Sequence, residues 1–160
     1  MKKYLTLATS LLAMSSVALA EEKPAQPAPA SEAKPPMMVL YVLDSSSKVA
    51  RPLQTTTYSV KNSKTHQLCW TAVNVPFKAS NEVVENFVAP AESTFVAKNG
   101  SVISSKDKTK HEVTYRKPSV NNESIGNCWR FDNTDPKGQY SLQVRVNEVQ
   151  FPTQTFTITE

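Results

Sequence analysis

The side chains that most often carry out catalysis are few in this chain and widely spaced. The two histidines, His66 and His111, lie far apart without neighbouring carboxylate ligands, and we interpret both as exposed residues at strand entries. Asp132 and Asp135 lie close together, but in a turn-like segment where aspartate is common. The sequence predicts no catalytic residue, no metal site and no cofactor, so we expect a protein that is not an enzyme. A carboxylate pair assembled from distant strands remains the hydrolase alternative.

The only cysteines and the only tryptophans of the chain occur together, as Cys69-Trp70 and Cys128-Trp129. Neighbouring residues of an extended strand point to opposite faces, so cysteine and tryptophan cannot share a face in either dipeptide. Arg130 and Asp132 share the face of Cys128 and should meet water. The pattern therefore predicts Trp70 and Trp129 as core aromatics and both cysteines on an outer face.

Two cysteines in an exported chain favour a disulfide, here between Cys69 and Cys128. It would join neighbouring strands and close a loop of about 60 residues, worth about 4 kcal/mol in the chain-entropy model. Free thiols, metal ligation and an intermolecular bond remain alternatives. If the cysteines face inward instead, the tryptophans would form an exposed aromatic platform for a glycan or a protein.

Period-two alternation of apolar and polar residues recurs along the chain and predicts β-strands. It is clearest over residues 138–147, and it returns over 151–160. Further strands are predicted at 38–43, 55–60, 68–75, 93–97, 112–116 and 127–132, whereas 78–90 contains a possible helical turn. Turn residues punctuate these segments. We expect a single antiparallel β-sandwich of about 7–9 strands.

The segment DPKGQYSL, residues 135–142, resembles the approach to the penultimate strand of immunoglobulin-like domains. The resemblance implies a tyrosine corner, in which the hydroxyl of Tyr140 bonds to backbone just upstream. Leu142 stands where antibody domains carry a cysteine. The resemblance covers about a dozen residues and concerns the fold alone.

Three regions of different composition succeed one another along the chain. Residues 1–20 have two lysines, an apolar stretch and Ala18-Leu19-Ala20, which predict a signal peptide cleaved after Ala20. Residues 21–36 are mostly Pro, Ala, Glu and Lys, a composition typical of a disordered spacer. Residues 37–160 form the predicted sandwich domain. We expect a periplasmic or secreted protein without a membrane span.

The formal net charge of +4 says little about the partner. Lysines gather modestly at Lys98, Lys106, Lys108 and Lys110, but no aromatic residues alternate with them, and export removes nucleic acid as the usual partner. We expect the partner to be another protein or a macromolecule of the cell envelope or a host surface.

Two groups of residues are candidate binding surfaces. One is the apolar set Phe77, Val83, Val84 and Phe87 in residues 76–90, for which core packing is the alternative. The other is the lysine group Lys106, Lys108 and Lys110. An unpaired edge strand is a third possibility, although the sequence does not indicate which strand. We expect a non-enzymatic binding or accessory protein of the envelope; alternatives are an inhibitor of a lysozyme-type hydrolase and a small carboxylate-based hydrolase.

Overall fold

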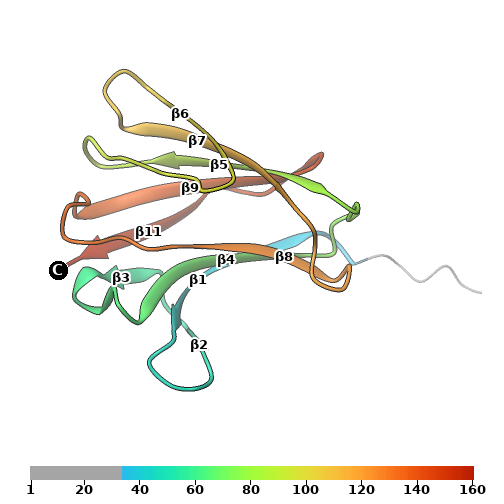
Figure 1. The fold of residues 1–160 in the computed structure, drawn as a ribbon, viewed down its shortest axis with the longest axis horizontal. Coiled ribbons are helices and arrows are strands. Elements are labelled where there is room, and N and C mark those ends of the chain that lie inside the picture. Colours follow the sequence, from blue (N-terminus) through green and yellow to red (C-terminus); the bar gives the residue numbers. More distant parts are fainter. Residues whose placement is uncertain (1–33) are drawn as a thin grey trace, which may run out of the picture. The chain divides into compact units, whose positions relative to one another are not determined.

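The computed structural model describes residues 34–160, which form a β-sandwich of two sheets (Figure 1). The predicted signal peptide and residues 21–33 of the predicted spacer lie outside the described residues. Within residues 34–160 the only helical element is a 3-10 turn, Val60–Asn62. No helix of that part has the length and apolar character needed to cross a membrane.

The smaller sheet contains four antiparallel strands in the order β2-β1-β4-β8. Their bounds are β1 (Met37–Asp44), β2 (Arg51–Leu53), β4 (His66–Val73) and β8 (Ser124–Trp129). On the central strand β4, Leu68, Trp70 and Ala72 are buried on the inner face, as the alternation predicts. The pairing of β4 with β8 places Cys69 directly opposite Cys128.

The larger sheet has the order β3-β11-β9-β5-β7-β6, with β10 paired to β9. Its strands are β3 (Thr57–Ser59), β5 (Asn81–Val88), β6 (Gly100–Ser104), β7 (Lys110–Lys117), β9 (Gly138–Val146), β10 (Val149–Gln150) and β11 (Gln154–Thr159). All pairs are antiparallel except β3 with β11, which run parallel. The predicted all-β sandwich is confirmed. Strand β3 lies within the predicted strand 55–60, whereas alternation did not predict β2, β6 and β10.

The core lies between the two inner faces, where apolar side chains of alternate residues meet. Strand β9 contributes Tyr140, Leu142, Val144 and Val146, all at most 1% exposed. Strand β11 adds Phe156, which stacks on Tyr140 with ring centroids 5.0 Å apart. Burial of these inner faces is the main source of stability in such a sandwich.

The tyrosine corner implied by the immunoglobulin-like resemblance is present. The hydroxyl of Tyr140 donates to the carbonyl oxygen of Pro136 at 2.8 Å. Gly138, between them, has φ of 135°, a conformation that residues with a Cβ atom rarely adopt. The bond fixes the turn that leads from β8 into β9.

Two expectations about local structure are wrong. Residues 93–97 alternate but belong to no strand: they pair with neither sheet, and the Ser93 N–H bonds the carbonyl oxygen of Lys108 instead. Residues 78–90 contain no helical turn; Asn81–Val88 forms the regular strand β5, paired on one side with β7 and on the other with β9. The buried polar residues that interrupt its apolar pattern, Asn81 and Glu85, form hydrogen bonds with residues of other strands.

The two sheets are unequal, and this leaves one side of the sandwich open. Strand β8 ends the smaller sheet and faces β5, whereas the larger sheet continues past β5 with β7 and β6 (Figure 1). The segment 92–99, between β5 and β6, runs along this open side. Strand β8 is therefore an edge strand beside an incompletely covered sheet.

Candidate binding pocket

A carboxylate lies at the centre of the sandwich. Glu85 is on the inner face of β5, between Val83 and Phe87, and its side chain is 0% exposed. An inward position on a strand normally carries an apolar residue, because an unpaired buried charge costs several kcal/mol. Hydrogen-bond donors from the surrounding strands must therefore compensate for its burial.

Four side chains from β4, β7 and β8 donate to the two oxygens of Glu85. Oε1 accepts from Trp70 Nε1, from Tyr115 Oη at 3.2 Å and from Asn127 Nδ2 at 3.2 Å. Oε2 accepts from Trp129 Nε1 at 3.1 Å and more weakly from Asn127 at 3.4 Å. Both tryptophans of the Cys-Trp dipeptides thus bind one carboxylate.

The donors and the burial act in opposite directions on the charge of Glu85. Burial raises the pKa of this carboxyl above its ordinary value, whereas hydrogen bonds from Trp70, Asn127, Trp129 and Tyr115 lower it. Burial also raises the pKa of the Tyr115 hydroxyl, as does the neighbouring Glu85 charge. An indole N–H can only donate, and the carboxylate of Glu85 accepts from both indoles. Because the tryptophans belong to the smaller sheet and Glu85 to the larger one, these hydrogen bonds connect the two sheets.

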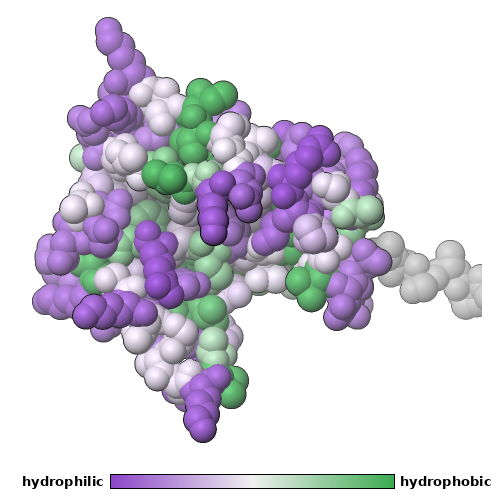
Figure 2. Space-filling view, in the orientation of Figure 1, coloured by the Kyte–Doolittle hydropathy of each residue, from purple (hydrophilic) through white to green (hydrophobic). Residues whose placement is uncertain are grey.

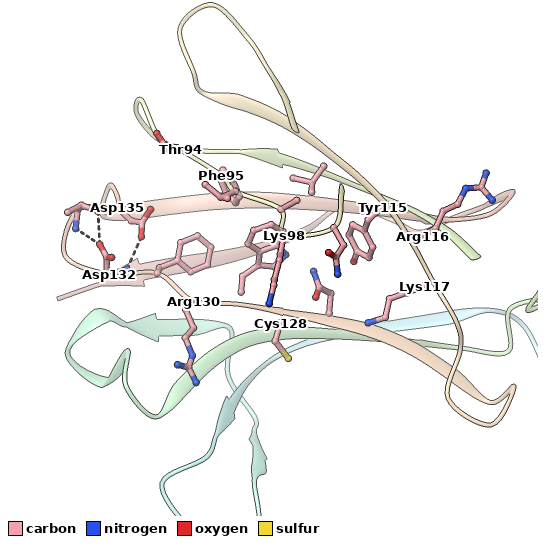
Figure 3. Close-up of a pocket in the computed structure, with 18 residues that line it drawn as sticks. Thr94, Phe95, Lys98, Tyr115, Arg116, Lys117, Cys128, Arg130, Asp132 and Asp135 are labelled. Atoms are coloured by element: carbon pink, nitrogen blue, oxygen red, sulfur yellow. Dashed lines mark hydrogen bonds between the residues drawn. The ribbon is translucent and has the colours of Figure 1, made fainter. Parts of the chain in front are cut away.

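A pocket of about 610 Å³ opens beside this cluster, between β8, β7 and residues 94–99 (Figure 3). Trp129, Asn127 and Tyr115 line it, so the side chains that bind Glu85 separate that carboxylate from the cavity. Phe95 and Phe131 add aromatic surface. The volume lies within the range typical of ligand sites, and its lining combines aromatic with polar groups as such sites do.

The charged side chains around the pocket differ in their direction relative to the cavity. Lys98 and Lys117 extend toward β8, whereas Arg116 and Arg130 point away from the cavity (Figure 3). At the opposite end, Asp132 is held in a turn by Thr134, whose backbone and hydroxyl hydrogen bonds lower the pKa of that carboxyl. The cationic groups directed at β8 therefore favour an anionic ligand.

The free edge of β8 borders the pocket. The Cα atoms of Cys69 and Cys128 are 4.0 Å apart, the short spacing of a pair that exchanges no backbone hydrogen bonds. The N–H and C=O groups of Cys128 consequently point away from β4, and so do those of Gly126. Lys117 confirms this direction, since its Nζ donates to the carbonyl oxygen of Gly126 at 2.5 Å.

The surface around this side is mostly hydrophilic, with apolar side chains scattered among polar ones on the face in view (Figure 2). One exposed apolar residue of the pocket lining is Val96, which is 78% exposed. Among the described residues, no group of three His, Cys, Asp or Glu side chains is placed to hold a metal ion.

Comparison with known sequences places this fold in a family. The model of the PM0630 beta sandwich domain matches residues 38–159, nearly all of the described part. The chain belongs to the PM0630 β-sandwich domain family. The uncharacterized protein PM0630 of Pasteurella multocida (strain Pm70) is 32% identical to it over 125 residues, which cover 77% of each chain.

In this member of the PM0630 family, Cys69 and Cys128 form the disulfide that the sequence predicted. Cys128 is exposed on the outer face, and Cys69, on the same face, is 1% exposed. Trp70 is buried in the core, as is Tyr140, whereas Trp129 is half-buried at the pocket wall. The cysteines face outward and the indoles inward.

The apolar candidate binding surface of this PM0630-family domain is not available. Val83 and Phe87 are core residues of β5, Val84 is also buried, and Phe77 is partly buried against the core. The expectation of an exposed apolar loop was based on a region without strand period, and the structure shows that this region is a central strand. Core packing, the alternative, explains these residues.

The lysine candidates are exposed and do not line the pocket: Lys106 and Lys108 lie in the turn between β6 and β7, and Lys110 is the first residue of β7. Lys108 pairs with Glu92 at 2.8 Å. The expectation of an exposed His111 is wrong: this residue is 3% exposed, since Ser93, Ser104 and the carbonyl of Lys108 bond its ring nitrogens.

Sequence reasoning missed Glu85, Asn127 and Tyr115 as members of one cluster. A signal was present, because Glu85 is a charged residue at an inward position between Val83 and Phe87. That signal could only be read once the segment was known to be a strand. The identity of its donors depends on contacts between strands distant in sequence.

Proposed function

We propose that the protein is an exported, non-catalytic binding protein of the cell envelope or its surroundings. Its binding site would be the pocket between β8 and residues 94–99, together with the free edge of β8. The observation that carries this proposal is the 610 Å³ aromatic and cationic cavity on the open side of the sandwich. The partner would be another protein or an envelope or host-surface macromolecule.

The chemistry of the carboxylates supports a role without catalysis. Glu85 is fully buried and both of its oxygens accept hydrogen bonds, so a substrate has no access to it. Asp132 and Asp135 lie in one turn at the end of the pocket, where Asp135 Oδ2 accepts a hydrogen bond from the backbone N–H of Asp132 at 2.7 Å. The disulfide supports an oxidising compartment, either the periplasm or the exterior.

Site-specific photo-cross-linking in living cells tests this proposal. A photoreactive amino acid replaces Lys98 or Val96 at the pocket, and in a control replaces Lys61, an exposed residue of the 3-10 turn outside the pocket lining. We expect a discrete adduct from positions 98 and 96 but not from position 61. Identical adducts from all three positions, or none from the pocket, would contradict the proposal.

A further inference from the structure

We propose that the ligand of this site is an extended acidic segment of another protein, which adds as a strand beside β8 and inserts an apolar side chain into the pocket. This inference rests on the proposed function and specifies the partner. It follows from the backbone of β8, from the alternation of side chains along a strand, and from the two lysines directed at this edge.

The backbone of β8 provides the first argument. Cys128 directs its N–H and C=O groups away from β4, and among residues 34–160 no hydrogen bond reaches them from another element. The neighbouring outward carbonyl, that of Gly126, is occupied by Lys117. An incoming strand therefore finds its unsatisfied backbone partners at and beyond Cys128, next to the pocket.

The alternation of side chains provides the second argument. Asn127 and Trp129 point inward from β8, so residues of an added strand that lie opposite them also point inward. That direction leads into the cavity lined by Phe95, Tyr115 and Trp129. Because the larger sheet extends past β8 with β7 and β6, the added strand would cover a part of it that the smaller sheet leaves open.

Charge provides the third argument. Lys98 and Lys117 extend toward β8, whereas Asp132 at the end of the pocket is held by hydrogen bonds within its turn. An acidic segment complements the two lysines.

A defined probe tests the proposal on the protein expressed from its full-length sequence and purified as the cell processes it. Random linear dodecapeptides displayed on phage are selected on this protein, and the enriched sequence is synthesised. We expect acidic residues together with large apolar residues at alternate positions. Methylating one backbone nitrogen at a time should weaken binding about tenfold at every second residue only.

Charge variants supply the matched comparison. Lys98→Glu should weaken the peptide about three- to fivefold, and Lys61→Glu, the same change outside the site, should leave binding unchanged. Equal tolerance to methylation at all positions, failure to enrich any peptide, or binding of an anionic polysaccharide such as polygalacturonate instead would overturn the strand proposal. Adducts from position 98 would in those cases still support the binding function.

Discussion

Trp129 donates its indole N–H to Oε2 of Glu85 from the opposite sheet, at 3.1 Å. Trp70, one strand away, donates to the other oxygen. The tryptophan after each disulfide-bonded cysteine therefore binds the same buried carboxylate. At this point the disulfide connects β4 to β8, and the hydrogen bonds of the two indoles connect both strands to β5. The half-buried Trp129 also lines the pocket, which links this internal cluster to the candidate binding surface.

Replacing Glu85 with glutamine should destabilise the protein by about 2–3 kcal/mol at pH 7. Each oxygen faces an indole N–H, so the new amide NH2 must meet a donor in either orientation. Tyr115→Phe removes only one of three donors to Oε1 and should cost about 1 kcal/mol. Urea unfolding of both variants gives these free energies, and a Glu85→Gln variant as stable as the wild type would contradict the account.

The stability of the protein should depend on pH through Glu85. Burial raises the pKa of this carboxyl above its ordinary value of 4.5. The folded state then binds the proton more tightly than the unfolded state. The resulting stability is present below about pH 4.5 and is lost as the pH rises through the raised pKa.

A comparison with Glu85→Gln isolates this effect, because the other carboxylates titrate alike in both proteins. The difference in the free energy of unfolding, wild type minus variant, should decrease as the pH rises above about 4.5. Urea titrations at several pH values measure it. A difference that increases with pH would mean that the donors outweigh burial and hold the pKa below its ordinary value.

Alternation identified most strands because their inward residues are apolar, as in β9 and β11. It failed at β5, where the charged Glu85 occupies an inward position and the apolar Val84 and Val88 occupy outward ones. Alternation alone also gave a false strand at 93–97, because a strand requires backbone pairing as well as a pattern and these residues pair with neither sheet. His111 was misplaced for the same reason as Glu85: its burial depends on partners elsewhere in the fold.

Reducing the disulfide should lower the free energy of unfolding by about 4 kcal/mol, because the Cys69–Cys128 bond closes a long loop in the unfolded chain. Urea unfolding with and without reductant measures the loss. A variant with both cysteines replaced by alanine is the control and should not respond to reductant. Equal stability of the oxidised and reduced proteins would argue against a structural role.

Removing the hydroxyl of Tyr140 should cost about 1 kcal/mol, since its bond to the Pro136 carbonyl lies at the edge of the core. Tyr41→Phe is the matched control: its hydroxyl bonds Thr71 at a partly exposed position, where water can replace it. Thermal unfolding of the two variants makes the comparison. A larger loss at Tyr41 than at Tyr140 would contradict the importance of the tyrosine corner.

The most direct test of the binding site uses the two indole N–H resonances of the protein in nuclear magnetic resonance, one for each tryptophan. The protein is titrated with the partner that cross-links at position 98. Binding in the pocket should shift the resonance of the half-buried Trp129 more than that of Trp70, which is 1% exposed. A partner that binds while both indole resonances stay in place would show that the pocket beside β8 is not the binding site.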